Sequence, residues 1–211
     1  MNQPKVTKKA LRTAVLARRA TLSSDFIAAQ GEPLLTQVRT LDAVATAQTV
    51  AAYVSMGTEI PTFPLLRWLL ESGKKVLVPR LGTGREIGWS YLSDMNSLAD
   101  MGKHRPEEPE SATVLGIDAI GAAEAIILPA LFVDSQGYRL GRGAGWYDRT
   151  LAFRHPDSLV GAVVYPWEVE SDTPTTSLMA EFAGSEQKLP HNSYDVPVTH
   201  VITAETVRRI R

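Results

Sequence analysis

Stretches of apolar residues with the length of strands recur along the chain. Residues 125–133 have the length and composition of a buried strand. Residues 87–92 alternate between apolar and polar positions, as a half-buried strand does. Four further strands are predicted, at residues 49–54, 75–79, 159–164 and 200–203.

Helical patterns lie between several of these strands. Four helices are predicted, over residues 5–21, 25–39, 63–72 and 146–153. Gly73 follows the third helix and ends it, as glycine commonly does. Strands that alternate with helices predict a single α/β domain, in which a mostly parallel sheet is covered by helices on both faces.

The first predicted helix has an unusual charge pattern. All charged residues before Asp25 are basic, which superficially resembles a transit peptide. However, Leu11, Val15, Leu16 and Leu22 give an apolar stripe at helical spacing. We therefore predict a helix of the mature protein that packs on the domain surface.

Composition and charge exclude several classes of protein. The chain has 211 residues, 44% of them hydrophobic, which suits one domain over residues 1–211. The net charge of −1 argues against nucleic-acid binding, and no apolar run approaches the ~20 residues of a membrane-spanning helix. The absence of cysteine excludes disulfides and thiolate metal sites and fits a cytoplasmic location.

Residues 166–190 differ from the rest of the chain. The segment is polar, rich in serine, threonine and glutamate, and has little periodicity. The simpler interpretation is a surface loop without function inserted into the domain. The alternative is a functional lid that covers a site.

A glycine-rich loop follows the predicted strand at 125–133. Its glycines surround Arg139 and Arg142, and Trp146 begins the next predicted helix. Glycine lets backbone N–H groups approach an anion, a helix N-terminus adds partial positive charge, and arginine donates in a fork to phosphate. The pattern predicts a polyphosphate cradle, and Asp148 adds a carboxylate for a metal ion.

Glycine-rich turns also join strands to helices in α/β proteins where the turn binds nothing. The loop is not a Walker A motif, because no Gly-Lys-Ser/Thr follows. It is a poor dinucleotide fingerprint as well, since it lies far along the chain and lacks the required acidic residue after it. A nucleotide at this loop would therefore be bound in a way that differs from both of these motifs.

The loop resembles the signature of the 5-formyltetrahydrofolate cyclo-ligase (5,10-methenyltetrahydrofolate synthetase) family, R-L-G-x-G-x-G-[YW]-Y-D. Residues 139–149 have the sequence RLGRGAGWYDR. Ala144 stands where members often carry glycine or lysine, and Trp146 replaces the commoner tyrosine. The resemblance implies a nucleotide-binding-like α/β fold of the NagB/RpiA/CoA-transferase type.

The resemblance also implies an ATP site made from two segments. The family's N-terminal K-x-x-L-R pattern is present at residues 8–12, so Lys8 and Arg12 inherit its ATP contacts. On the residues alone, these two side chains share one helix face, which is more commonly just solvated. The ATP-binding residues implied are Lys8, Lys9, Arg12, Arg139, Leu140, Gly141, Arg142, Gly143, Ala144, Gly145, Trp146 and Tyr147.

Two further motifs resemble the family's folate and metal sites. Glu59-Ile60-Pro61-Thr62 fits its E-[VI]-x-T pattern, which makes Glu59 and Val54 the folate-binding residues, although Glu59 could merely cap a helix near Phe63. Mg²⁺ is implied at Asp148 and Asp195. Near Asp195 the chain departs from the family, with Tyr194 in place of histidine and Thr199 in place of aspartate.

The implied function is ATP- and Mg²⁺-dependent cyclisation of 5-formyltetrahydrofolate to 5,10-methenyltetrahydrofolate, with release of ADP and phosphate. Arg142 and Tyr147 are the catalytic candidates, and the protein is expected to be a monomer that binds only small molecules. Phosphorylation of the formyl oxygen makes it a good leaving group, so positioning and charge neutralisation suffice for catalysis.

Two alternatives have support in the sequence. Ala144, Thr199 and the insertion fit a non-catalytic relative that binds nucleotide or folate. A sugar-phosphate isomerase of similar fold would hold one phosphate in the loop and use Glu59 as its base, but it leaves Lys8 and Arg12 unexplained.

Overall fold

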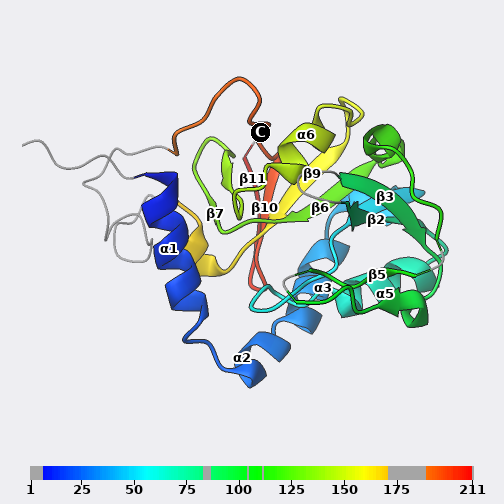
Figure 1. Ribbon diagram of the computed structural model, residues 1–211, viewed down its shortest axis with the longest axis horizontal. Coiled ribbons are helices and arrows are strands. Elements are labelled where there is room, and N and C mark those ends of the chain that lie inside the picture. Colours follow the sequence, from blue (N-terminus) through cyan, green and yellow to red (C-terminus); the bar gives the residue numbers. More distant parts are fainter. Residues whose placement is uncertain (1–6, 83–86, 104, 111, 171–188, 211) are drawn as a thin grey trace, which may run out of the picture.

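A seven-stranded sheet forms the centre of the molecule (Figure 1). The computed structural model describes residues 7–82, 87–103, 105–110, 112–170 and 189–210. The strand order is β11-β10-β9-β6-β1-β2-β3. In chain order the strands are β1 (Thr49–Ala52), β2 (Lys75–Leu81), β3 (Ile87–Leu92), β6 (Ala125–Pro129), β9 (Leu159–Val163), β10 (His200–Ile202) and β11 (Val207–Arg209).

The five inner strands are parallel, and each edge strand is antiparallel to its neighbour. In the middle of the sheet, Val50 of β1 lies opposite Val76 of β2 and Ala125 of β6. The prediction of a mostly parallel α/β sheet is therefore confirmed. Because the inner strands run the same way, the loops after β1, β2 and β6 meet at one edge of the sheet.

Helices and short strands complete the fold. The α-helices are α1 (Lys8–Arg19), α2 (Ser24–Ala28), α3 (Gly31–Arg39), α4 (Asp42–Thr46), α5 (Phe63–Glu71) and α6 (Trp146–Leu151). The 3₁₀ helices are η1 (Met95–Ser97), η2 (Ile117–Ala122) and η3 (Pro166–Glu168). The strands β4 (Leu98–Ala99) and β5 (Glu108–Pro109) form one antiparallel ribbon, and β7 (Phe132–Val133) and β8 (Arg139–Leu140) form another.

Both faces of the sheet are covered, as predicted. Successive residues of a strand point to opposite faces. Val50 therefore packs in one apolar cluster with residues of α3, α4 and α5, whereas Ala51 packs in another with Ile120 of η2 and Leu151 of α6. Figure 1 shows α3 and α5 on one side of the sheet and α6 on the other.

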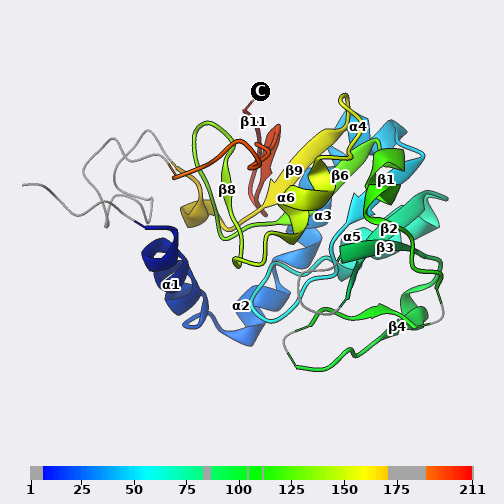
Figure 2. The same ribbon diagram turned by 45° about the horizontal axis from the view of Figure 1, so that its top comes forward.

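Helix α1 lies at one side of the domain in both views (Figures 1 and 2). Its buried residues Leu11 and Val15 pack against Leu131, Phe132 and Leu140, around the β7–β8 ribbon. The apolar stripe predicted from the sequence thus packs α1 against the β7–β8 ribbon, which directly precedes the glycine-rich loop.

Two predicted elements are each divided in two. The helix expected over residues 25–39 breaks between α2 and α3, and Pro33, which has no N–H to donate, lies in the first turn of α3 where that donor is not needed. The strand expected over 125–133 leaves the sheet after Pro129. The N–H of Leu131 then bonds to the carbonyl of Leu140, so β7 pairs with β8 instead.

Most of the predicted insertion at 166–190 lies outside the described residues, which include η3 at its start. Its interpretation as a loop or lid therefore stays a prediction. Among the helices of the described ranges, none has both the length and the apolar character that crossing a membrane requires.

Candidate active site

A cavity of about 270 Å³ opens where the carboxyl ends of β6, β1 and β2 meet. The loop after β1, the end of β2, the turn after β6, helix α1 and the glycine-rich loop all contribute to its walls. The lining residues that the sequence predicted are Lys8, Arg12, Val54, Glu59, Arg139, Leu140, Gly141, Arg142, Gly143, Ala144, Gly145, Trp146, Tyr147, Asp148 and Asp195. Residues from one end of the chain to the other thus form a single site.

Lys9 is the one predicted site residue that does not line the cavity. It is exposed on α1, whereas Lys8 and Arg12 both reach the cavity wall. Residues one position apart on a helix point in different directions, and those four apart share a face. The predicted ATP contact of Lys9 therefore finds no support in the cavity lining, in contrast to those of Lys8 and Arg12.

The glycine-rich loop needs glycine at two positions that matter for its shape. Gly143 has φ +109° and Gly145 has φ +67°, a region that side chains with a Cβ rarely adopt. A Cβ built on Gly143 would lie 3.4 Å from Cζ of Arg12. Arg12 Nε donates a hydrogen bond to the carbonyl of Gly141 at 2.9 Å, so α1 and the loop are in direct contact.

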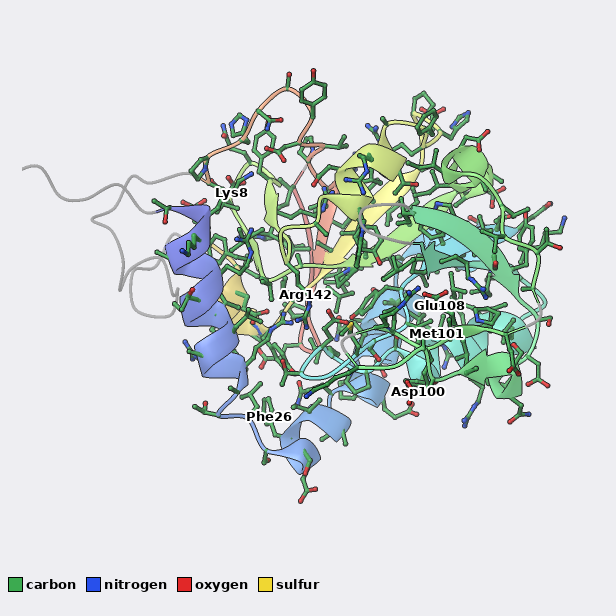
Figure 3. The ribbon with its side chains drawn as sticks, in the orientation of Figure 1. Lys8, Phe26, Asp100, Met101, Glu108 and Arg142 are labelled. Carbon is green, nitrogen blue, oxygen red and sulfur yellow. The ribbon has the colours of Figure 1, made fainter. Side chains whose placement is uncertain are left out.

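Cations and carboxylates of the site are paired with one another. These pairs join groups that the sequence assigned to different ligands, namely phosphate, Mg²⁺ and folate. The pairs are Lys8–Asp195 at 3.2 Å, Arg139–Asp148 at 2.5 Å and Arg142–Glu59 at 3.2 Å. Figure 3 shows Lys8 at the end of α1 and Arg142 near the middle of the molecule.

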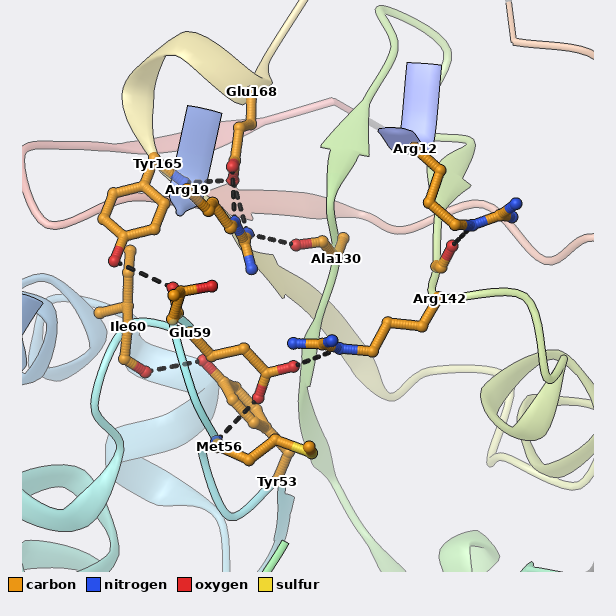
Figure 4. A network of polar contacts seen from close by, with 12 residues as sticks. Arg12, Arg19, Tyr53, Met56, Glu59, Ile60, Ala130, Arg142, Tyr165 and Glu168 are labelled. Carbon is orange, nitrogen blue, oxygen red and sulfur yellow. Dashed lines mark hydrogen bonds and ion pairs between the residues drawn. The ribbon is translucent and has the colours of Figure 1, made fainter. Parts of the chain in front are cut away.

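Glu59 is buried at the bottom of the loop after β1 (Figure 4). One carboxylate oxygen accepts from Arg142 Nε and the other from the N–H of Met56 at 3.0 Å. Burial raises the pKa of Glu59, and the charge of Arg142 opposes that shift. Glu59 thus accepts a hydrogen bond across the cavity from Arg142, which belongs to the glycine-rich loop.

Two aromatic phenols border this carboxylate. Tyr53 donates to the carbonyl of Ile60 at 3.1 Å, and burial raises its pKa well above the usual range. Burial also raises the pKa of Tyr147, and the charge of Glu59 adds to that rise. Both phenols are protonated at neutral pH, as tyrosine ordinarily is, and Tyr147 lines the cavity, where its hydroxyl can donate a hydrogen bond to a ligand.

Asp148 and Asp195 approach the same buried guanidinium. Arg139 donates to Asp148 and, through its other terminal nitrogen, to the carbonyl of Val196 at 2.5 Å. Burial lowers the pKa of Arg139, and the charges of Asp148 and Asp195 oppose that change. Mg²⁺ is commonly held by one or two carboxylates together with substrate phosphates and water, so this pair of aspartates fits such an ion.

No group of three or more histidine, cysteine or carboxylate side chains capable of holding a metal occurs within the described ranges. A cation at Asp148 and Asp195 would therefore take its remaining ligands from phosphate oxygens and water. The structure brings together the residues of this predicted site, and their roles remain predictions.

An apolar wall of the cavity was missed by the sequence analysis. It consists of Met56, Pro79, Leu81, Pro106, Pro129, Ala130 and Leu131. Pro79 and Leu81 lie at the carboxyl end of β2, a position where parallel sheets bind ligands, so that rule could have found them. The others come together only in the folded chain. The wall suits a flat, largely apolar part of a substrate.

Comparison with known sequences gives consistent matches. A family model described as the 5-formyltetrahydrofolate cyclo-ligase family matches residues 4–204. The 5-formyltetrahydrofolate cyclo-ligase of Mycolicibacterium smegmatis is 34% identical over 203 residues and aligns over 93% of each chain. The protein of the same name from Escherichia coli K12 is 28% identical over 193 residues, covering 90% of this chain and 96% of that one.

Solved structures of similar fold carry related names. The 5,10-methenyltetrahydrofolate synthetase of Aquifex aeolicus superposes with a TM-score of 0.74 at 26% identity, covering 97% of this chain and 93% of that one. The synthetase from Mycoplasma pneumoniae gives a TM-score of 0.66 at 16% identity, covering 93% and 98%, and shows the likeness of fold.

Proposed function

The chain belongs to the 5-formyltetrahydrofolate cyclo-ligase family, and on this premise we propose that it cyclises 5-formyltetrahydrofolate to 5,10-methenyltetrahydrofolate with ATP, releasing ADP and phosphate. The observation that carries the proposal is the single cavity lined by the predicted nucleotide and folate residues other than Lys9. Its lining includes four cations, Lys8, Arg12, Arg139 and Arg142. Four cations suit a triphosphate better than the single phosphate of a sugar-phosphate isomerase.

In the proposed reaction, N10 of the folate attacks the formyl carbon while the formyl oxygen leaves as phosphate. A formamide oxygen is a poor leaving group until the γ-phosphoryl group of ATP has been transferred to it. Lys8, Arg12 and Arg142 would neutralise charge on the phosphates, and the N–H groups of the glycine-rich loop would donate to their oxygens. No protein nucleophile is needed, since both reactants are held in one cavity.

Glu59 and the apolar wall would hold the folate. The carboxylate can accept two hydrogen bonds from an N–H-rich ring edge, and the wall can cover the ring faces. The Tyr147 phenol, which lines the cavity and is protonated at neutral pH, would donate to an oxygen of the transferring group. These roles place phosphoryl transfer between the glycine-rich loop and Glu59.

Asp148 and Asp195 would hold Mg²⁺, which when bound neutralises phosphate charge and aligns the phosphoryl group for transfer. Arg139 and Lys8, which now pair with these aspartates, would then contact phosphate oxygens. Before ligand binding, Lys8 and Arg139 pair with the two aspartates. After binding, phosphate would neutralise the two cations and Mg²⁺ would neutralise the two aspartates, so no charge would be left without a partner.

Absorbance of the methenyl product tests the proposal directly. Purified protein is mixed with ATP, Mg²⁺ and 5-formyltetrahydrofolate, and parallel reactions omit ATP or Mg²⁺. We expect absorbance to rise only in the complete mixture, together with an equal amount of phosphate. Binding of both ligands without any rise would instead identify a non-catalytic relative.

A further inference from the structure

The buried stripe of α1 ends in a charged residue. Leu11, Val15 and Arg19 follow one another at intervals of four and are the buried residues of the helix. The side chain of Arg19 is only 2% exposed, although its neighbour Arg18 lies at the surface. An arginine is almost never buried to this degree without a dedicated partner.

The partner is Glu168 of η3, which is fully buried (Figure 4). Arg19 donates from Nε to one carboxylate oxygen at 2.7 Å and from Nη2 to the other at 2.6 Å. Nη2 also donates to the carbonyl of Ala130 at 2.8 Å, and the guanidinium lies 5.2 Å from the centre of the Tyr165 ring. The fork is therefore held in a single orientation.

The groups that accept hydrogen bonds from the Arg19 guanidinium, Glu168 and the carbonyl of Ala130, are connected to the wall of the active site. Glu168 also accepts from the N–H of Tyr165 at 2.9 Å, two residues after the end of β9. The Tyr165 hydroxyl donates to the carbonyl of Thr58, next to Glu59. Ala130 itself lines the cavity. Arg19 thus connects the end of α1 to three segments that surround the site.

Because α1 is one continuous helix, the position of Arg19 also determines the positions of Lys8 and Arg12, which line the cavity. Arg12 lies seven residues before Arg19, which is about two turns or ~10 Å along the same face. Lys8 and Arg12 reach the cavity from the opposite end of α1. A buried ion pair adds little net stability over an apolar pair of similar size, whereas a forked pair defines orientation strictly.

We infer that Arg19 is a positioning residue for the nucleotide: its forked pair with Glu168 sets the rotation and height of α1, and thereby places Lys8 and Arg12 at the glycine-rich loop. The inference rests on the proposed function. Arg19 does not line the cavity, so it acts through the helix and not on the reacting atoms.

The test replaces both partners at once, as Arg19→Met together with Glu168→Met, so that no buried charge is left unpaired. We expect the KM for ATP to rise roughly tenfold, since small displacements of binding groups have large effects, while the KM for folate stays within about twofold. Arg39→Met is the matched control, because Arg39 is an exposed arginine in the last turn of α3 that lies over the ring of Trp68 and has no part in the contact between α1 and η3.

A second variant, Arg19→Lys, keeps the buried charge near Glu168 but cannot form the fork. It should show the same selective rise in KM for ATP, with a melting temperature close to that of the native protein. Equal rises in both KM values, or an unchanged KM for ATP in either folded variant, would overturn the inference.

Calorimetry with a nonhydrolysable ATP analogue repeats the comparison without turnover. Weaker binding by the Arg19 variants and unchanged binding by Arg39→Met is the expected result, and equal affinities would overturn the inference. A native protein that fails to form the methenyl product would contradict the proposed function. Normal turnover with no effect at Arg19 would contradict only the positioning role.

Discussion

Arginine–glutamate pairs occur in two very different settings in this protein. Arg19 and Glu168 are 2% and 0% exposed and share two hydrogen bonds. Arg142 and Glu59 are 42% and 8% exposed and share one hydrogen bond at 3.2 Å. The side-chain chemistry is identical, so the difference lies in burial and in the number of contacts.

This difference separates a contact that fixes the orientation of a helix from one that a ligand can exchange. Removing one partner of a buried pair leaves an uncompensated charge and costs about 3–5 kcal/mol. In the cavity pair, Glu59 is also buried but Arg142 is partly exposed, so water competes for the charge of Arg142 and weakens the ion pair. We therefore expect a ligand to compete for the partly exposed Arg142, whereas Arg19 does not line the cavity.

Asp148→Asn should have the largest effect among the exchangeable pairs. The amide can still accept from Arg139, so the melting temperature should change little, but a neutral oxygen is a poor Mg²⁺ ligand. A metal ion contributes several kcal/mol to phosphoryl transfer, so kcat should fall by roughly 100-fold or more and respond less to Mg²⁺.

The matched control for this change is Asp157→Asn, whose side chain is 92% exposed and does not line the cavity. Titration of activity with Mg²⁺ gives the comparison. A lowered melting temperature with the native Mg²⁺ dependence would make Asp148 structural and leave Asp195 as the stronger metal candidate.

Arg142→Ala should come next, with its main effect on ATP. Loss of a charge-assisted contact costs about 1.5–3 kcal/mol, which is roughly a 10- to 150-fold rise in the KM for ATP. Arg67→Ala, at an exposed position of α5, serves as the control. Steady-state kinetics with each substrate varied in turn would show whether ATP is affected more than folate; unchanged ATP kinetics would remove Arg142 from the site.

Glu59→Gln should weaken folate use by roughly tenfold while ATP binding stays nearly normal, because the amide cannot accept two donors as a carboxylate does. The pH dependence follows from the raised pKa of Glu59. Folate affinity should fall as pH drops through this pKa, at a higher pH than for an ordinary glutamate, and the variant should lack this step.

Fluorescence or calorimetric titration of folate across a pH series measures both effects. Normal folate affinity combined with weakened ATP binding would mean that the two halves of the site are assigned in reverse.

The smallest expected effect is a coupling between the two ligands. If phosphate draws Arg142 away, Glu59 is released for folate, and an ATP analogue should increase folate affinity by at most about fivefold, the equivalent of ~1 kcal/mol for a partly exposed pair. Folate should increase affinity for the analogue by the same factor. Arg142→Ala should abolish the coupling, and coupling that persists in the variant would show that another contact carries it.

Local patterns in the sequence were sufficient for six of the seven strands of the sheet and for most of the cavity, whereas the edge strand β11 was not predicted. Apolar runs predict strands wherever both faces are covered, and the backbone of the loop favours glycine at positions 143 and 145. The split of residues 25–39 into α2 and α3 was missed, although Pro33 marks it. The departure of β7 from the sheet was missed because its pairing partner β8 lies beyond the next turn.

The sequence by itself determined which residues can bind phosphate, accept hydrogen bonds or enter a core, because these properties belong to side chains and to local spacing. It did not distinguish Arg19 from Arg18, since both are basic residues at the end of one helix. Only the tertiary structure decided that Arg19 is buried against Glu168, that Lys9 faces away and that Arg142 pairs with Glu59. Each of these outcomes depends on segments distant in sequence, whose approach is set by the packing of the whole domain.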